Sequence, residues 1–190
     1  MLFPIFCINT VLAFLALVNF ISIRRPGRLV SVEKSVIVLL PVRNEEINIE
    51  RIVNELQSQE GISQLSLIVI NDNSEDRTRE LALGAADSKT SIIDAPPPQP
   101  GWIGKVSALQ FGFQTAPKAD IYISVDADVH FESDAIARAI TLQEKAGVDF
   151  ISPYPRQIAQ SWAERLIQPL LQWSWMSTVL LRGAEKFPLA

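Results

Sequence analysis

The chain has 190 residues, enough for one domain of ordinary size, and its net charge of -4 excludes the basic surface that non-specific nucleic-acid binding requires. It has one cysteine, Cys7, and one histidine, which exclude an internal disulfide and the usual Cys/His zinc site. Hydrophobic residues make up 48% and charged residues 20%. This is too charged for a polytopic membrane protein, so we expect a soluble domain with one added apolar segment.

Residues 2–23 form an apolar run without a charge, and about 20 such residues span a bilayer as a helix. Three arginines follow this run, in the reverse order of a secretory signal peptide: Arg24, Arg25 and Arg28. The positive-inside rule then predicts a single-pass membrane helix over 2–23, with the main domain in the cytoplasm. A buried core helix is the alternative. Residues 24–34, with Pro26 and Gly27, are predicted to form a linker.

From residue 35 the chain alternates between two kinds of pattern. Short apolar runs rich in β-branched residues predict buried parallel strands over 35–40 and 65–70. Further strands are predicted over 91–94 and 121–125, with another starting over 149–152. Helical spacing of apolar residues predicts helices over 48–59, 75–86, 104–115 and 133–146. The proline-rich run 95–101 predicts irregular chain. Strands that alternate with helices predict an α/β fold, with a mostly parallel sheet covered on both faces.

Polar residues follow three of these strands. They are Pro41, Arg43, Asn44 and Glu45 after the first strand, Asn71, Asp72, Asn73 and Ser74 after the second, and Asp126 and Asp128 after the fourth. Ligands of open α/β sheets bind beyond the carboxyl ends of the strands. Turn and helix-capping chemistry is the alternative for each loop alone. Because polar residues recur at the ends of successive strands, the sequence favours one polar binding edge.

The Asp126-Ala127-Asp128 run places two carboxylates one residue apart at a strand end. Neighbouring anions repel unless a cation or a donor lies beside them. Mg²⁺ and Mn²⁺ prefer oxygen ligands and bridge carboxylates to phosphates, so the run predicts a divalent metal that carries a diphosphate. A solvated acidic turn is the alternative. His130 is a third metal contact, a pocket residue or a half-exposed structural histidine.

Residues 101–105 (GWIGK) follow the prolines and open a predicted helix. Glycines let the backbone approach a ligand, and Lys105 in a first helical turn favours phosphate. The alternative is a solvated surface lysine. The spacing is not that of a P-loop, and the absence of GxGxxG counts against a dinucleotide dehydrogenase.

Together these motifs resemble the family 2 glycosyltransferases, whose GT-A fold is a nucleotide-sugar-binding α/β domain. The similar segments, in the family's order, are 36–46 (VIVLLPVRNEE), 71–74 (NDNS), Gly104-Lys105 with Ala108-Leu109, and the DxD run 126–128 preceded by Ala119-Asp120. PPPQPGWIGK and residues 161–171 (SWAERLIQPLL) are similar to the hopene-associated and carotenoid-type membrane glycosyltransferases. The resemblance covers the N-terminal portion of such an enzyme.

The resemblance implies a role for each matching residue. Pro41, Arg43 and Glu45 would line the pocket of the nucleotide base and ribose, and Asp72 would bind the base. Lys105 would lie near the base or diphosphate. Asp126 would contact ribose or sugar, and Asp128 would bind Mg²⁺ or Mn²⁺. Asn71 departs from the family, where an aspartate is common, and an amide cannot supply the same charge.

The family's catalytic base is an acid well after the DxD, and none of the later acids stands in that context: Glu132, Asp134, Glu144, Asp149, Glu164 and Glu185. Residues 168–173 (QPLLQW) are not the QxxRW of processive members. We therefore expect that the base and the acceptor half of the domain lie outside this chain. The expected nucleotide-sugar-binding domain is 35–156.

Residues 157–190 are predicted to form an amphipathic interfacial segment, because Trp162, Trp173 and Trp175 stand among leucines while Glu164 and Arg165 disfavour the bilayer centre. We expect a break near Pro169. A core helix that covers the sheet, or one whose partner is missing, is the alternative.

The predicted function is transfer of a sugar from a UDP- or GDP-linked donor to a lipid-like acceptor, such as a hopanoid or carotenoid, at a membrane. A catalytically incomplete, membrane-anchored nucleotide-sugar-binding fragment is the first alternative. A nucleotidyltransferase is the second, but its usual glycine-rich loop after the first strand is replaced here by residues 41–46 (PVRNEE).

Overall fold

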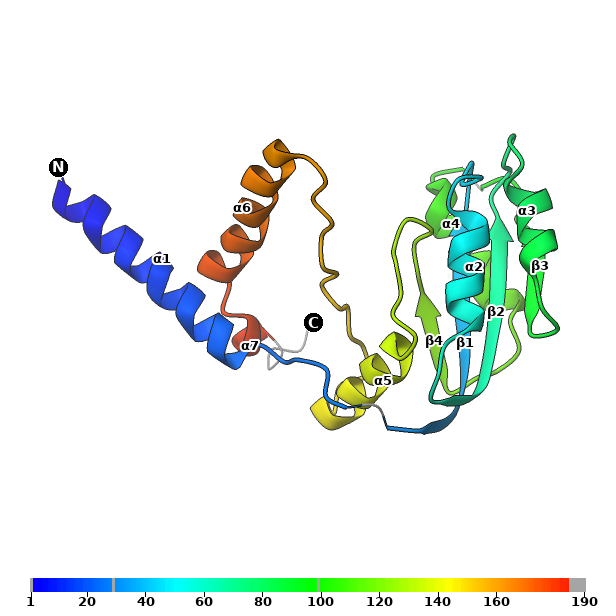
Figure 1. Cartoon of the computed structure of the whole chain (residues 1–190), viewed down its shortest axis with the longest axis horizontal. Coiled ribbons are helices and arrows are strands. Elements are labelled where there is room, and N and C mark those ends of the chain that lie inside the picture. The colour runs from blue at the N-terminus through cyan, green and yellow to red at the C-terminus, as the bar shows by residue number, and fades with distance from the viewer. Residues whose placement is uncertain (1, 29, 99, 185–190) are drawn as a thin grey trace. The chain divides into compact units, whose positions relative to one another are not determined.

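The computed structural model describes residues 2–28, 30–98 and 100–184. The chain divides into a sheet unit, Pro26–Ser152, and a helical unit, Met1–Arg25 with Pro153–Ala190. The sheet unit contains β1 (Val32–Val42), α2 (Ile49–Gln57), β2 (Ile62–Asn71), α3 (Thr78–Ala85), β3 (Thr90–Asp94), α4 (Gly104–Thr115), β4 (Ile121–Ser124) and α5 (Ala135–Ala146) (Figure 1). The helical unit contains α1 (Leu2–Ser22), α6 (Trp162–Thr178) and α7 (Leu181–Ala184).

The four strands form one parallel sheet in the order β3-β2-β1-β4. The central strand, β1, is buried continuously over residues 36–42. A parallel strand covered on both faces has no solvent side, and for this reason its sequence is an unbroken apolar run. The predicted parallel α/β sheet is therefore confirmed.

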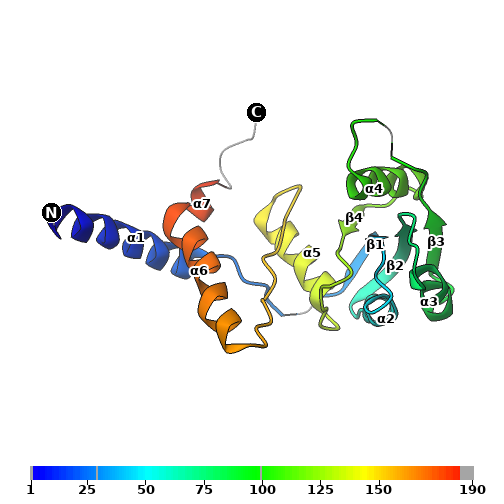
Figure 2. The same ribbon diagram turned by 90° about the horizontal axis from the view of Figure 1, so that it is seen from above.

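Helices cover both faces of this sheet (Figure 2). Val36, Val38 and Leu40 of β1 share a core with buried residues of α2, α3 and α5. The alternate side chains Ile37 and Leu39 share a second core with Ala108 of α4. Successive side chains of a strand point to opposite faces, so one strand supplies both cores. The result is the predicted three-layer α/β/α arrangement, which brings the carboxyl ends of the strands to one edge.

Two predicted strand boundaries and one predicted strand differ from the structure. β1 and β2 both begin three residues earlier than expected, because Val32 pairs with Ile62 across the sheet. The predicted linker 24–34 thus ends inside β1. The strand predicted over 149–152 is wrong: this segment has no strand partner among the described residues, and Phe150 is exposed. A strand needs a hydrogen-bonded neighbour, which an apolar pattern alone cannot supply.

Gly112 lies where α4 packs most closely on the sheet. A Cβ added there would lie 2.2 Å from Cδ1 of Ile70, a fully buried residue of β2. We expect Gly112→Ala to lower the free energy of unfolding by roughly 1–3 kcal/mol, because the packed core must shift to admit the methyl group. Gly84→Ala is the matched control, since no atom lies within 4 Å of its added Cβ. Urea titration of both variants measures the difference.

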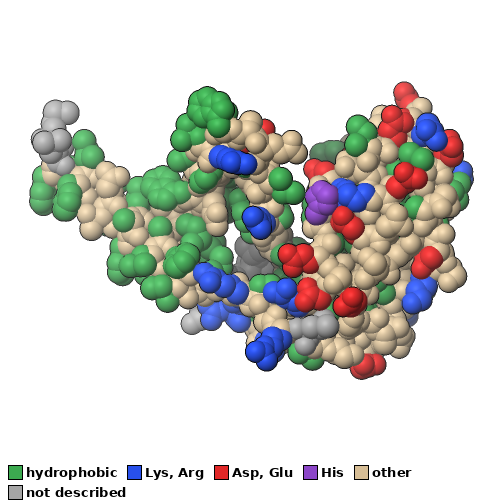
Figure 3. Space-filling model, viewed as in Figure 1, with side chains coloured by type: hydrophobic (Ala, Val, Ile, Leu, Met, Phe, Trp, Pro, Cys, Tyr) green, Lys and Arg blue, Asp and Glu red, His purple; other side chains and the backbone are tan. Residues whose placement is uncertain are grey.

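In the helical unit, α1 confirms the helix expected over residues 2–23. Its residues 3–22 are long and apolar enough to cross a membrane by length and composition. Figure 3 shows hydrophobic side chains gathered over this helix, and most of its large apolar side chains are exposed. That this helix spans a membrane remains a prediction.

The side chain of Asn19 is fully buried and joins α1 to the end of α6. Its Nδ2 donates to the carbonyl oxygens of Met176 at 2.8 Å and Val179 at 2.6 Å, and its Oδ1 accepts from the Leu181 amide at 3.0 Å. These are backbone groups at a helix end, which have no partner within the helix. One amide therefore fixes the junction of α6 and α7 on α1.

The predicted break near Pro169 is wrong, because α6 runs through this residue without interruption. Proline removes one helical hydrogen bond, but both ends of α6 are fixed by other bonds. At the start, Ser161 and Glu164 form a reciprocal capping box, and at the end Asn19 binds the last turn. Residues 185–190 of the predicted interfacial segment, Leu29 of the linker and Gln99 of the proline run lie outside the described residues.

Candidate functional site

A pocket of about 230 Å³ lies at the carboxyl ends of the strands. It is lined by Pro41, Val42, Arg43, Glu45, Asp72, Lys105, Asp126, Ala127 and Asp128. All seven residues that the sequence predicts for the site are in this set, although they come from four separate segments. The structure therefore brings the predicted residues together around one cavity.

Lys105 and Asp126 pair across the mouth of this pocket. The Lys105 Nζ lies 2.5 Å from Asp126 Oδ1, and each side chain is about half exposed, at 53%. Lys105 is the second residue of α4, so the helix N-terminus and the ammonium lie on the same side of the pocket. Both favour an anion, and the phosphate oxygens of a nucleotide would compete with Asp126 for the ammonium.

Gly104 allows α4 to begin directly against Asp72. A Cβ at Gly104 would lie 2.8 Å from the Asp72 carboxylate, which is buried at the end of β2. Any side chain here would displace that carboxylate or the helix. The close approach of the backbone to a pocket residue thus explains Gly104, the second glycine of the GWIGK run.

The loops after β1 and β2 hold each other through backbone amides. Asn44 N–H donates to Ser74 Oγ at 3.1 Å, and Glu75 N–H donates back to Asn44 Oδ1 at 2.9 Å. Glu45 N–H donates to Thr78 Oγ1 at 2.7 Å. Asn44 and Asn73 have positive φ values of 56° and 54°, a conformation that asparagine tolerates better than most residues. These contacts fix the backbone that carries Arg43, Glu45 and Asp72.

Arg51 and Glu55 of α2 hold the loop that contains the DxD run. Arg51 donates to the carbonyl oxygens of Ala127 at 3.0 Å and Val129 at 2.9 Å. Glu55 accepts from the Phe131 amide at 2.9 Å, and Arg51 and Glu55 pair at 3.1 Å. Sequence reasoning missed both residues, because on a helix an i, i+4 pair of opposite charges reads as an ordinary solvated face. Nothing local in the sequence links α2 to a loop more than 70 residues away.

His130 lies against this same pair rather than in the pocket. Its Nδ1 is 3.1 Å from Glu55 Oε1 and 3.1 Å from Arg51 Nη1. Within the described ranges, no three His, Cys, Asp or Glu side chains gather as a metal site. Asp126 and Asp128 still fit a hard divalent cation, since Mg²⁺ sites commonly use one or two carboxylates and take their other ligands from phosphate and water.

The sequence profile described as Glycosyl transferase family 2 matches residues 37–187, well over half of the chain. The chain belongs to this family. The match includes the second half of β1, the DxD run and α6, so it covers the pocket and the segment that follows the sheet unit.

Two relatives are lipid glycosyltransferases by name. The chain is 32% identical over 127 residues to the 4,4'-diaponeurosporenoate glycosyltransferase of Staphylococcus haemolyticus, covering 64% of this chain and 32% of the relative. It is 27% identical over 141 residues to the undecaprenyl-phosphate 4-deoxy-4-formamido-L-arabinose transferase of Edwardsiella ictaluri, covering 71% and 42%. This family 2 chain thus spans about a third of the length of the first relative.

Two solved structures share the fold. The mannosyltransferase PcManGT from Pyrobaculum calidifontis, in complex with GDP-Man and Mn²⁺, aligns with a TM-score of 0.55 and 19% identity, over 73% of this chain and 42% of that one. TarS 1-349 of S. aureus aligns with a TM-score of 0.52 and 17% identity, over 67% and 39%. At these identities the likeness shows the fold alone, and this fold is the predicted GT-A type.

Asn71, which departs from the family pattern, has a structural use for its amide. Its Nδ2 donates to Asp94 Oδ1 at 2.8 Å, and its Oδ1 accepts from the Ser74 amide at 3.2 Å. Asp94 is also held by Arg79 at 3.0 Å, and the hydrogen bonds from Arg79 and then Asn71 hold the pKa of Asp94 below its ordinary value. Asn71 therefore connects the ends of β2 and β3. Sequence reasoning did not identify Asp94 as its partner.

We expect Asn71→Asp to destabilise this family 2 chain by roughly 1–3 kcal/mol at neutral pH, because a carboxylate would replace the donor that faces Asp94. The loss should shrink as the pH falls, since one shared proton restores the hydrogen bond and removes the repulsion. Urea titration at neutral and mildly acidic pH measures both effects. Asn54→Asp, at an exposed position of α2, is the matched control. An equal loss at both pH values would contradict this account of Asn71.

The acidic residues that follow the DxD run and that the structure describes lie outside the pocket. Glu132 and Asp134 pair with Arg138 at 3.8 and 3.3 Å, and Glu144 pairs with Lys34 at 2.8 Å. Glu164 forms the capping box of α6, and Glu185 lies outside the described residues. None of the described ones lines the pocket. That the catalytic base lies outside this chain stays a prediction.

Proposed function

We propose that this chain carries the donor site of an enzyme that transfers a sugar from a nucleoside diphosphate to a lipid-like acceptor. The observation that carries the proposal is the single pocket in which Lys105, Asp126 and Asp128 meet Asp72 and Arg43 in a family 2 fold. A lysine at a helix N-terminus beside two carboxylates offers a cationic group for phosphate, and the carboxylates can bind the sugar hydroxyls and a divalent cation.

Each pocket residue has a proposed role. Pro41, Arg43 and Glu45 line the site of base and ribose, and Asp72 accepts hydrogen bonds from the base. Lys105 exchanges its ion pair with Asp126 for the diphosphate, which frees Asp126 for ribose or sugar. Asp128 holds Mg²⁺ or Mn²⁺. The GDP-Man and Mn²⁺ held by the mannosyltransferase of the same fold are in keeping with a divalent cation and a nucleoside diphosphate here.

When bound, the cation would offset the negative charge that develops on the diphosphate as it leaves the sugar. Lys105 would add a second positive charge at the same group. Arg51 and Glu55 would keep Asp126 and Asp128 in place through the loop backbone, so that little reorganisation is needed during transfer.

The acceptor is proposed to be lipid-like and the enzyme to act at a membrane. The two relatives are named for a carotenoid acid and for undecaprenyl phosphate, which are both lipids. The candidate span in α1 supports membrane attachment, and the arginines that follow it support a cytoplasmic sheet unit.

The full chain, reconstituted in lipid vesicles and incubated with radiolabelled UDP- and GDP-sugars and Mn²⁺, tests this proposal. Metal-dependent donor binding supports the proposed donor site. Binding without transfer of label to the lipid phase is the result expected if the catalytic base lies outside this chain, as for a catalytically incomplete, membrane-anchored fragment, and transfer would place the base within this chain. A folded chain that binds neither nucleotide sugar contradicts both.

A further inference from the structure

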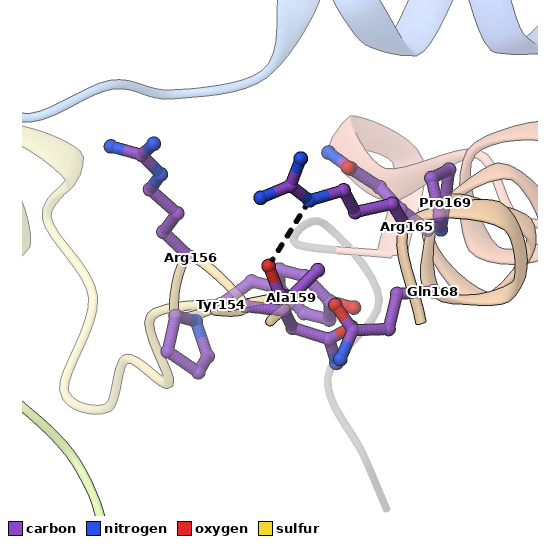
Figure 4. Close-up of a pocket in the computed structure, with 9 residues that line it drawn as sticks. Tyr154, Arg156, Ala159, Arg165, Gln168 and Pro169 are labelled. Carbon is purple, nitrogen blue, oxygen red and sulfur yellow. Dashed lines mark hydrogen bonds between the residues drawn. The ribbon is translucent and has the colours of Figure 1, made fainter. Parts of the chain in front are cut away.

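The helical unit contains a second, larger pocket, which the donor site does not use. It has a volume of about 480 Å³ and lies between residues 154–159 and one side of α6 (Figure 4). Arg165, Gln168 and Gln172 line it from α6, and Tyr154 and Arg156 line it from the preceding segment. The positions on α6 differ by three, four and seven residues, so they form one polar stripe along the helix.

The lining of this pocket is cationic. It includes two arginines and no aspartate or glutamate. Arg165 Nε donates to the Ala159 carbonyl at 3.4 Å, which leaves the outer guanidinium nitrogens free to bind a ligand. Figure 4 shows the guanidinium groups of Arg156 and Arg165 on the same side of Tyr154. The nearby Glu164 carboxylate accepts instead from the amides of Gln160 and Ser161. Two like charges at one rim are stabilised by an anion between them.

The opposite side of α6 is apolar and exposed. Leu166, Ile167, Leu170 and Leu171 are each at least 50% exposed in this structure. Trp162 and Trp173 lie beside them and are also exposed. A helix with an apolar face, flanking tryptophans and a polar stripe is typical of one that lies in the membrane interface.

The pocket and the candidate membrane span belong to the same unit. Asn19 of α1 binds the end of α6, so a membrane-inserted α1 would hold α6 near the lipid head groups. This position favours a lipid head group over a free phosphate, because anionic lipids attract basic side chains that lie near the membrane surface.

We propose that Arg156 and Arg165 bind the anionic head group of a bilayer lipid, with the side-chain amides of Gln168 and Gln172 as further donors. The guanidinium groups are suited to bidentate contacts with phosphate oxygens. The inference rests on the membrane insertion of α1 that the proposed function includes. It is independent of donor binding, which takes place in the sheet unit.

Quenching of tryptophan fluorescence by brominated lipids tests the proposal. The full chain is prepared with Trp102→Phe, so that all three remaining tryptophans lie on α6. It is reconstituted in phosphatidylcholine vesicles that contain either brominated phosphatidylglycerol or brominated phosphatidylcholine. We expect the anionic lipid to associate roughly tenfold more strongly, given the attraction of two arginines near the surface.

Three variants give this measurement its controls. Arg156→Gln/Arg165→Gln should bring the ratio of the two lipids close to one, and Arg156→Lys/Arg165→Lys should keep most of the preference. Arg77→Gln/Lys118→Gln removes the same charge from exposed positions of the sheet unit and should change nothing. Arg156→Gln alone removes no hydrogen bond that the structure shows, so it lowers the preference without a risk to the fold.

Equal quenching by the two lipids in the unsubstituted chain would overturn the proposal, and so would an unchanged preference in Arg156→Gln/Arg165→Gln. A third measurement adds inorganic phosphate to the vesicles, with Arg77→Gln/Lys118→Gln as the control for membrane insertion. If phosphate abolishes the lipid preference while this control variant stays inserted, the site is one for free phosphate and the proposal fails. Metal-dependent nucleotide binding, measured on the same samples, should remain unchanged in every variant. A loss there would report a failure of the donor site instead.

Discussion

Replacing Asp126 and Asp128 together with asparagine is expected to abolish the metal dependence of nucleotide binding. The two carboxylates line the pocket beside Lys105, and carboxylate oxygens are the ligands that a hard divalent cation prefers. Asparagine keeps the size of each side chain but removes its charge. We expect affinity for UDP or GDP in the presence of Mn²⁺ to fall by on the order of 100-fold or more, since even the partners of metal ligands contribute up to ~100-fold.

Isothermal titration of the full chain in detergent, with and without Mn²⁺, measures this loss. Glu132→Gln/Asp149→Asn is the matched control, because it removes two exposed acids that do not line the pocket. Asp126→Asn alone should weaken binding less, since Lys105 loses its partner and becomes more available to phosphate. Unchanged Mn²⁺-dependent binding in the double variant would show that the cation is held elsewhere.

Replacement of Arg51 is expected to have the second large effect, on both stability and donor binding, although Arg51 does not line the pocket. Arg51→Met leaves the carbonyl oxygens of Ala127 and Val129 without their donor and Glu55 without its cation. We expect a loss of roughly 2–4 kcal/mol in the free energy of unfolding, because a largely buried charged group would be left without its partner. Donor affinity should fall by about tenfold, the scale found when a group that orients metal ligands is removed.

Urea titration and nucleotide titration of the same variant separate the two effects. Arg77→Met is the control, since Arg77 forms an exposed pair with Glu80 at 3.2 Å, and such pairs contribute little. Arg51→Lys should recover part of the stability but not the contacts to both carbonyl oxygens. Arg51→Met with wild-type donor affinity would mean that the DxD loop keeps its shape without α2.

The hydrogen bonds of Glu55 to the DxD loop also predict that the stability of the fold depends on pH. Burial raises the pKa of Glu55, but hydrogen bonds from the Phe131 amide, His130 and Arg51 outweigh it and hold the pKa below its ordinary value. A carboxyl group with a lowered folded-state pKa stabilises the fold fully above the ordinary pKa of about 4.5, and this stabilisation is lost as the pH falls through the lower folded-state value. Glu55→Gln should therefore flatten the acid limb of the stability curve, measured by urea titration across that range.

The sequence could predict the sheet and the pocket because both depend on local patterns. All four strands form over the residues that predict them, 35–40, 65–70, 91–94 and 121–125. The two inner strands have long buried apolar runs, whereas the edge strands β3 and β4 are only partly buried. The polar loops follow the strands, and a parallel sheet must bring them to one edge. Six of the seven site residues were thus identifiable from their place after a strand, and Lys105 from its place at the start of a predicted helix.

What the sequence could not predict depends on contacts between distant segments. Arg51 and Glu55 contact the DxD loop only in the folded chain. Asn71 binds Asp94 at the end of the neighbouring strand, 23 residues later in the sequence. The segment 149–152 has a strand's composition but no neighbour to pair with, and α6 continues through Pro169 because Asn19 and a capping box hold its two ends. In each case a tertiary contact, or its lack, overrides the local pattern.

The central claim is that the pocket at the strand ends is a metal-dependent donor site. Isothermal titration of the unsubstituted full chain with UDP and GDP, with and without Mn²⁺, tests it most directly. We predict binding of at least one nucleotide that depends on Mn²⁺ and disappears in Asp126→Asn/Asp128→Asn. A folded chain that binds neither nucleotide with Mn²⁺, or that binds equally well in the double variant, would contradict the claim.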